Sequence, residues 1–437
     1  MTFFAYTGEA MSQLFEHMKQ NPVFYVTRDI ERALGLSVKT KGYFIISNFS
    51  EYSKKIAFGQ ENILLLEESQ KLDTFELLNH PKTQEFISQI TMAQPHILVF
   101  KNTSVIEKIC SEKGYNLLNP SALLSQKVEE KISQIEWLGE LAKYLPPHEV
   151  QEAKNISFDG TPFILQFNRA HTGLGTMKIE NKKQLNEIQQ KFPSRPVKKV
   201  SFINGPMFTS NNVVNEKNVL VGNISYQITG IKPFTENPFA TIGNDFALPH
   251  KILNEKQIEE YREIVEQIGK KLRHSGWKGL FGVDFILDEQ SGKLYLIEIN
   301  ARQPASTTFE SQLQENTKTP ARNPDSSGGG QKHESTLMTT FEEHLCALLG
   351  IDTSQDALIE ITNGAQIIQR VNSHNQHHFE QTKVIEQLEH LELLDIIPYE
   401  NTDPGSDFLR IQVPTGIMKQ HGELNETGLQ IAQILES

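Results

Sequence analysis

Two carboxylates and one carboxamide are spaced along the chain so that a single hairpin would bring them together. Asp284 interrupts an apolar extended segment, and Glu298 and Asn300 lie on an alternating segment that follows it. Residues 288–293, between the two segments, are turn-forming types, so the pattern predicts an antiparallel hairpin. If this hairpin closes symmetrically about Ser291, Asp284 lies directly opposite Glu298. Side chains alternate along a strand, so Glu298 and Asn300 share one face.

These three side chains have the chemistry of a site for a hard cation. Neighbouring strands lie about 4.8 Å apart, so the oxygens of Asp284, Glu298 and Asn300 can converge on one ion. Oxygen ligands without histidine or thiolate favour Mg²⁺, with Mn²⁺ as the alternative. Arg302 stays on the same face, and its planar guanidinium suits an anionic oxygen. The competing interpretation is an ordinary half-buried hairpin with a solvated polar face.

The order Gly-Val-Asp-Phe, hairpin, Ile-Glu-Ile-Asn-Ala-Arg resembles the metal-binding hairpin of the ATP-grasp superfamily. In that family the carboxylates and the asparagine hold magnesium against the β- and γ-phosphates of ATP, and the arginine faces an acyl-phosphate. The resemblance therefore implies metal ligation by Asp284, Glu298 and Asn300. It implies a catalytic role for Arg302, with ATP and Mg²⁺ as cofactors.

A helix is expected before the glycine-containing loop. Apolar residues from Val128 to Leu141 recur at helical spacing, which predicts one helix that continues up to Pro146. Lys131 lies near its start. The arrangement is similar to the family's helix whose lysine meets ATP phosphate, so the resemblance implies nucleotide binding by Lys131. The alternative is a solvated helix lysine, because exposed lysines are the rule.

Two short strands are predicted on either side of a glycine-containing loop. Glycine lets backbone N–H groups approach a phosphate without interference from a Cβ atom, although a plain hairpin turn has the same pattern. Placed between Lys131 and the metal hairpin, the loop resembles the phosphate-covering loop of the family. The resemblance implies that it binds nucleotide through Thr172, Gly173, Gly175 and Thr176.

Gln166, just before this loop, departs from the family pattern. The family usually has Lys or Arg there, whereas a glutamine donates a hydrogen bond but brings no charge. The resemblance still implies that Gln166 lies in the nucleotide site, and Arg169, His171 and Lys178 are the candidates to compensate for the missing charge.

The adenine-binding hinge is expected between two further strands. Residues 198–205 and 207–214 read as strand, turn and strand, and this position resembles the interlobe hinge of the family. The resemblance implies that the backbone of Phe202 and Ile203 binds adenine. The acidic residue that commonly binds ribose in the family is not evident nearby.

Three structural units are expected, in an α/β and α+β combination. Residues 1–120 contain continuous apolar runs typical of a parallel sheet, which predicts a Rossmann-like layer, and the resemblance implies the pre-ATP-grasp domain. Residues 121–350 would form the two-lobed ATP-grasp domain. Within it, residues 310–335 are polar and rich in Gly, Ser and Pro, so we expect a disordered insertion or a lid. Residues 351–437 would form a small α+β unit.

Composition narrows the class of protein. The chain has 437 residues, with 42 Lys and Arg against 54 Asp and Glu, and this acidic balance argues against a general nucleic-acid or anionic-membrane binder. Its two cysteines, Cys110 and Cys346, predict neither a disulfide framework nor a thiolate metal site. No apolar stretch is long enough for a membrane span, so we expect a soluble cytoplasmic protein. The sequence does not specify an oligomeric state.

The resemblance implies an ATP-dependent carboxylate–amine ligase. ATP would phosphorylate a carboxylate, and an amine would displace phosphate, so the expected partners are small-molecule carboxylate and amine substrates. Two alternatives stay open. One is a biotin-carboxylase-like enzyme acting on bicarbonate, although no biotin domain is present. The other is a nucleotide-binding protein without ligase turnover, which Gln166 and the missing ribose carboxylate favour.

Overall fold

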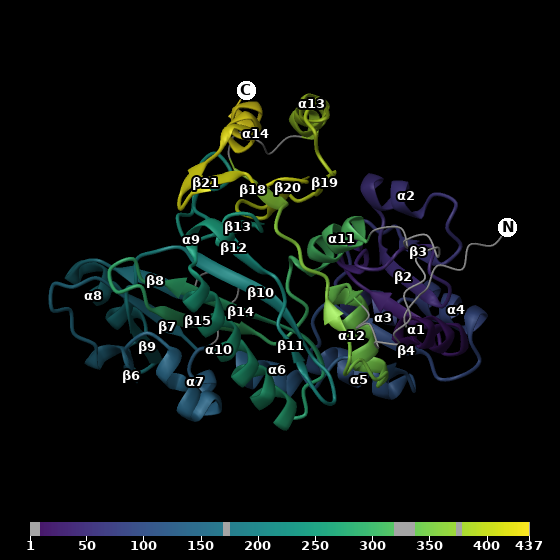
Figure 1. Ribbon diagram of the computed structural model, residues 1–437, viewed down its shortest axis with the longest axis horizontal. Coiled ribbons are helices and arrows are strands. Elements are labelled where there is room, and N and C mark those ends of the chain that lie inside the picture. Colours follow the sequence, from purple (N-terminus) through teal and green to yellow (C-terminus); the bar gives the residue numbers. More distant parts are fainter. Residues whose placement is uncertain (1–8, 169–174, 319–336, 373–377, 437) are drawn as a thin grey trace, which may run out of the picture.

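The chain builds three main sheets, which Figure 1 shows from the N-terminal unit in purple to the C-terminal elements in yellow. The computed structural model describes residues 9–168, 175–318, 337–372 and 378–436. One sheet is parallel and flanked by helices, and the other two are antiparallel. The expected combination of α/β and α+β architecture is confirmed.

The N-terminal unit is a five-stranded parallel sheet with the order β3-β2-β1-β4-β5. Its central strand β1 is buried at every position, as expected for a strand covered by helices on both faces. This confirms the predicted Rossmann-like layer. The elements are α1 (Glu9–Gln20), β1 (Val23–Val26), the 3₁₀ turn η1 (Ile30–Ala33), β2 (Tyr43–Asn48), α2 (Glu51–Ala57), β3 (Ile63–Leu66), α3 (Thr74–Asn79), α4 (Pro81–Ile90), β4 (His96–Val99), α5 (Ser104–Glu112) and β5 (Asn116–Leu117).

The helix predicted from Val128 to Pro146 is instead broken into short pieces. These are α6 (Ala122–Glu129), α7 (Ser133–Leu138) and a 3₁₀ segment η2 (Gly139–Tyr144). The break has a tertiary cause, because Asn168 Oδ1 accepts hydrogen bonds from the backbone N–H groups of Ile132 (2.8 Å) and Ser133 (3.4 Å). A side chain distant in sequence thus caps the start of α7. The prediction of one continuous helix was wrong.

A four-stranded antiparallel sheet with the order β6-β9-β7-β8 follows. Apolar side chains of α8, including Leu185 and Ile188, pack with one face of this sheet. The elements are β6 (His148–Glu152), the 3₁₀ turn η3 (Ala153–Asn155), β7 (Phe163–Phe167), β8 (Thr176–Ile179), α8 (Lys182–Lys191) and β9 (Pro196–Ser201). The strands predicted on either side of the glycine-containing loop are therefore confirmed as β7 and β8, which are antiparallel partners.

The largest sheet has nine strands, in the order β15-β14-β10-β12-β13-β18-β20-β19, with β11 paired to β10. Its long helix α10 begins with a capping box between Asn254 and Gln257 and buries one apolar stripe. No helix of the described part of the chain has the length and apolar character needed to cross a bilayer. Its elements up to the hairpin are β10 (Met207–Val214), β11 (Val219–Leu220), β12 (Ile224–Thr229), β13 (Thr241–Asp245), α9 (Pro249–Ile252), α10 (Glu255–His274), β14 (Gly279–Leu287) and β15 (Leu294–Asn300).

The C-terminal strands continue this same sheet, because β18 pairs with β13. A single apolar core runs from Phe285 of β14 to Ile431 of the last helix. The domain boundary expected at residue 350 therefore falls between β13 and β18, two paired strands of one sheet. The limits of the three domains stay a prediction. The elements are β17 (Ala357–Leu358), β18 (Ala365–Arg370), α13 (His378–Leu388), β19 (Asp395–Pro398), β20 (Asp407–Val413), β21 (Met418–Gln420), β22 (Glu423–Leu424) and α14 (Glu426–Glu436).

The disordered insertion or lid expected at 310–335 is corrected for its first residues, which belong to a helix, whereas residues 319–335 lie outside the described residues. Helix α11 comprises Thr307–Thr317. The next described elements are β16 (Leu337–Met338) and α12 (Thr340–Leu349). Polar residues of α11 are buried because they bond to α12: Ser311 Oγ accepts from Phe341 N (3.0 Å), and Gln314 Oε1 accepts from Thr340 N (2.8 Å). Composition suggested disorder, but tertiary partners satisfy these polar groups.

Candidate active site

The hairpin β14–β15 has the predicted register. Asp284 is the direct partner of Glu298, and Gly282 is the direct partner of Asn300. A Cβ atom at Gly282 would lie 2.9 Å from Pro304 Cγ and 3.3 Å from the Cβ of Asn300. Gly282 therefore gives Asn300 and the turn after β15 the room to pack closely. A register shift follows Asp284, so the symmetry about Ser291 holds only for the end of the hairpin that carries the polar residues.

Asp284 lies in a buried polar setting between two amides. Its Oδ1 accepts a hydrogen bond from Gln227 Nε2 (2.8 Å), and its Oδ2 accepts one from Asn300 Nδ2 (3.2 Å). Burial, and then the negative charge of Glu298, raise the pKa of Asp284 to about 6. A divalent cation would relieve this repulsion between two facing carboxylates, so the site fits a cation by its chemistry.

Glu298 is more exposed than Asp284, with 34% of its side chain accessible to solvent, and it forms an ion pair. The ammonium of Lys131 lies 2.9 Å from Glu298 Oε1. Burial acts to raise the pKa of Glu298, but Lys131 and then Arg302 overcome it and hold that pKa below its ordinary value. Within the described ranges no group of three or more His, Cys, Asp or Glu side chains converges on one point. The ligand set of Asp284, Glu298 and the carboxamide of Asn300 stays a prediction.

Lys131 lies in the break between α6 and α7 rather than inside a helix. Glu130 beside it accepts a hydrogen bond from Asn168 Nδ2 (2.8 Å), so the end of β7 holds this turn in place. The side chain of Lys131 is 16% exposed and reaches Glu298 across the space between the small sheet and the hairpin. The structure thus brings Lys131 to the hairpin β14–β15, and the solvated-lysine alternative was wrong.

Residues of the predicted phosphate loop are only partly placed. Thr172 and Gly173, together with Arg169 and His171, lie outside the described residues. Gln166 is 7% exposed, and its Nε2 donates to Thr176 Oγ1 (3.4 Å) on the partner strand β8. Binding of a nucleotide by the backbone N–H of Gly175, and by Gln166 and Thr176, stays a prediction.

Lys178 was one of the residues expected to replace the charge missing at Gln166, but its ammonium contacts other side chains. Its ammonium lies 2.8 Å from Glu180 and 4.2 Å from the ring centroid of Phe202. The residue paired directly with Gln166 on strand β9 is instead Lys198, whose side chain is 2% exposed. Sequence reasoning missed Lys198, because the pairing of β7 with β9 spans about thirty residues and a helix.

The expected hinge residues join the two antiparallel sheets. Phe202 and Ile203 follow β9 of the small sheet and precede β10 of the large sheet. Gly205 in this connection has a φ of 153°, and a Cβ atom there would lie 1.9 Å from the carbonyl oxygen of Leu287. Only glycine fits this approach of the hinge to β14. The adenine-binding role of Phe202 and Ile203 stays a prediction.

Arg302 has an anionic partner within the chain. Its guanidinium forms an ion pair with Glu129, the last residue of α6, and Lys101 lies 2.7 Å from the other oxygen of Glu129. Ser125 Oγ of α6 also donates to the carbonyl oxygen of Ala301 (2.7 Å), so α6 is fastened to the end of β15. Sequence reasoning missed Glu129, which lies 173 residues before Arg302.

The segment after Arg302 contacts the carboxyl end of the parallel sheet. Gln303 accepts a hydrogen bond from Tyr25 Oη (2.7 Å) and donates to the carbonyl oxygen of Arg32 (2.9 Å). Ligands of open α/β sheets bind outside the carboxyl ends of the strands. The loop after β1 and the segment after β15 therefore lie together outside the carboxyl ends of these strands, where ligands of such sheets bind.

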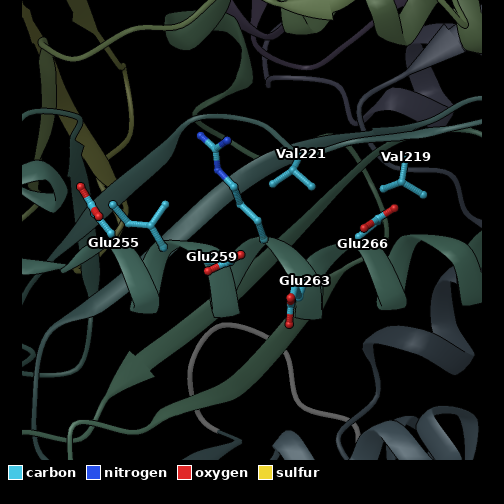
Figure 2. Close-up of a pocket in the computed structure, with 8 residues that line it drawn as sticks. Val219, Val221, Glu255, Glu259, Glu263 and Glu266 are labelled. Atoms are coloured by element: carbon cyan, nitrogen blue, oxygen red, sulfur yellow. The ribbon is translucent and has the colours of Figure 1, made fainter.

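A separate groove of about 450 Å³ lies on the outer side of α10, away from these residues. Figure 2 shows Glu255, Glu259, Glu263 and Glu266 along the helix, with Val219 and Val221 opposite them. The four carboxylates that line it outnumber its one cation, Arg262, and repel phosphate. The groove contains none of the predicted site residues and does not suit a nucleotide.

Comparisons with known proteins support the same fold. A family model described as the ATP-grasp domain matches residues 128–306. No curated protein matches the chain. The N5-carboxyaminoimidazole synthetase of Staphylococcus aureus complexed with ADP is similar over 95% of this chain and 97% of that chain, with 14% identity and a TM-score of 0.61.

Two further solved structures have similar coverage. The N5-carboxyaminoimidazole synthase of Aspergillus clavatus, in complex with ADP and 5-aminoimidazole ribonucleotide, has 15% identity over 96% of this chain and 99% of that chain, with a TM-score of 0.61. The L-amino acid ligase of Bacillus licheniformis has 12% identity over 95% and 97%, with a TM-score of 0.59. The resemblance carried by the hairpin is confirmed for this part of the chain: residues 128–306, which include the hairpin, match the ATP-grasp domain.

Proposed function

We propose that this protein is an ATP-dependent ligase that activates a carboxylate as an acyl-phosphate and joins it to an amine. The observation that carries the proposal is the facing pair Asp284 and Glu298, with Lys131 2.9 Å from Glu298, inside an ATP-grasp domain. This set of charges suits a metal-bound polyphosphate. The similarity to a synthetase solved with ADP and to an L-amino acid ligase supports the same class of reaction.

The residues have distinct roles in this proposal. Asp284, Glu298 and Asn300 hold a magnesium ion, which when bound supplies positive charge that offsets the charge of the phosphate oxygens. Lys131 leaves Glu298 and binds a phosphate oxygen. Arg302, oriented by Glu129, donates hydrogen bonds to the oxygens of the acyl-phosphate and stabilises the charge that develops as the amine attacks.

The hinge and the substrate side complete the proposed site. The backbone of Phe202 and Ile203 binds adenine, and the loop around Gly175 and Thr176 covers the phosphates. The carboxylate substrate lies between the segment after Arg302 and the carboxyl end of the parallel sheet. The substrates are small molecules, and the amine is an amino acid or an aminoimidazole, the classes named for the similar structures.

The test is ADP formation with Mg²⁺ across a panel of carboxylates, amino acids, 5-aminoimidazole ribonucleotide and bicarbonate. The double variant Asp284→Asn, Glu298→Gln is expected to lose turnover at least a thousandfold, because both anionic metal ligands become neutral. A matched double variant, Glu216→Gln with Asp352→Asn, changes two exposed surface carboxylates that pair with lysines and should keep full activity. Turnover retained in the Asp284/Glu298 variant would contradict the proposal.

A nucleotide-binding protein without turnover is the second candidate, and it is favoured by the neutral Gln166 in the phosphate site. Titration calorimetry with Mg-ATP, run beside the ADP assay, separates the two candidates. Binding with no ADP formed on any acceptor would favour the second.

A further inference from the structure

Lys198 is a buried cation without a counter-ion of its own. Its side chain is 2% exposed, and it is among the largest fully buried side chains of the protein. Among the residues described by the structure, no hydrogen bond or ion pair of its ammonium is found, whereas the nearby Lys131 already pairs with Glu298. Lysine is almost never fully buried unless it is paired, because desolvating an ammonium is costly. Burial, and then the charge of Lys131, lower the pKa of Lys198 to about 8, and Glu298 opposes this.

The strand geometry directs Lys198 away from the core of its own sheet. Its neighbours Val197 and Lys199 belong to the opposite face, where Val197 joins the apolar core and Lys199 lies 5.0 Å from the ring centroid of Phe163. Lys198 pairs directly with Gln166, and Gln166 with Thr176, so the three side chains project from the same face of the sheet. Lys198 therefore faces the space that holds Lys131 and Glu298.

Two ammonium groups, Lys131 and Lys198, lie beside the two carboxylates of the hairpin, but the one ion pair between them joins Lys131 to Glu298. A cation held by Asp284 and Glu298 would take both carboxylates and leave both ammonium groups without a counter-ion. Two adjacent ammonium groups match the closely spaced oxygens of a polyphosphate. In the cross-strand pair of Gln166 on β7 and Lys198 on β9, only Lys198 is charged.

We infer that Lys198 is a phosphate-binding residue, which contacts the polyphosphate of the nucleotide together with Lys131 and supplies from β9 the charge that Gln166 does not supply from β7. The inference rests on the proposed function for its ligand, a nucleoside triphosphate. Lys198 is then kept buried and unpaired in the free protein because the nucleotide provides its counter-ion. The cost of that burial is recovered when the nucleotide binds.

The experiment compares three variants by thermal unfolding and by titration with Mg-ATP and with AMP. Lys198→Met should raise the melting temperature of the nucleotide-free protein, because a buried unpaired charge is removed, and should weaken Mg-ATP binding at least tenfold. AMP binding should change less than threefold, because AMP lacks the β- and γ-phosphates. The control Lys199→Met removes the lysine on the opposite face, which pairs with Glu149 (3.2 Å), and should leave both affinities within twofold.

The double variant Gln166→Lys, Lys198→Gln moves the charge to the partner strand and should recover most of the Mg-ATP affinity. A merely structural lysine would not be rescued in this way. A lower melting temperature or loss of folding in Lys198→Met, an unchanged affinity for Mg-ATP, or no recovery in the double variant would each overturn the inference. These outcomes differ from failure of the proposed function, in which the unaltered protein binds Mg-ATP but forms no ADP with any substrate.

Discussion

The ammonium of Lys131 lies 2.9 Å from the carboxylate of Glu298, so a phosphate-binding candidate and a metal-ligand candidate neutralise each other in the free protein. Binding of a metal and a nucleotide together exchanges this one ion pair for two, one of Glu298 with the cation and one of Lys131 with phosphate. The free site thereby avoids an unpaired carboxylate next to Asp284.

Lys131→Met is expected to raise the KM for ATP at least tenfold, because a charge-assisted contact to phosphate is lost. The melting temperature of the nucleotide-free protein should fall as well, because Glu298 loses its counter-ion beside Asp284. Steady-state kinetics with ATP varied at saturating Mg²⁺ measure the effect. Lys127→Met, which changes an exposed lysine on the same segment, is the control and should match the unaltered protein.

Arg302→Lys is expected to lower kcat by about a hundredfold or more with little change in the KM for ATP. A lysine keeps the charge but loses the planar fork of donors that stabilises developing charge, and losing one such donor costs about 10²–10³ in kcat. Glu129→Gln should give a smaller loss, because Arg302 keeps its donors but loses the charged partner that orients it.

Both changes at the Arg302–Glu129 pair are measured by single-turnover and steady-state assays of ADP formation. Arg262→Lys, at an exposed ion pair with Glu360, provides a matched control for the substitution. A rise in the KM for ATP with unchanged kcat would place Arg302 at the nucleotide rather than at the acyl-phosphate.

Gly205→Ala is expected to destabilise the protein by several kcal/mol. The new Cβ would lie 1.9 Å from the carbonyl oxygen of Leu287, so the hinge would have to move away from β14. Denaturant unfolding measures the effect. Gly59→Ala is the control, because Gly59 also has a positive φ but nothing lies within 4 Å of the added Cβ, and a cost of only about 1 kcal/mol is expected there. Equal costs at the two positions would contradict the argument from hinge packing.

Glu343→Gln is expected to flatten the dependence of stability on pH. Burial, and then the neighbouring Asp356 and Glu342, raise the pKa of Glu343 to about 8, above the ordinary value of 4.5 that it has in an unfolded chain. Between these two pH values the folded protein binds a proton that the unfolded chain has released, so stability falls as pH rises, by ~1.4 kcal/mol per pH unit for this group.

Glutamine at position 343 resembles the protonated carboxyl group and does not titrate. The variant should therefore match the unaltered protein near pH 5 and be more stable near pH 8, by thermal unfolding at both pH values. Glu259→Gln, at an exposed position on α10, should leave the pH dependence unchanged. A variant that is less stable than the unaltered protein at pH 8 would indicate that Glu343 is ionised in the fold.

Local patterns determined the hairpin and the N-terminal sheet. The two-residue period of the strands, with a polar turn between them, was enough to place Asp284 opposite Glu298. Four continuous apolar runs likewise predicted strands of a parallel sheet, because strands buried on both faces need apolar residues at consecutive positions. In each case the deciding interactions lie between residues close in sequence or follow from burial alone.

Pairings between distant segments decided the rest. The spacing of apolar residues after Val128 correctly predicted helical structure, but Asn168 binds the backbone at Ile132, and Lys131 lies in the break between α6 and α7. Likewise, Glu129 meets Arg302 across 173 residues, and Lys198 meets Gln166 only through the register of β9 on β7. The C-terminal strands join the large sheet through the pairing of β13 with β18. Residue types and local periodicity define which groups are available for such contacts, but which of them meet depends on how whole elements pack, and that is a property of the folded chain.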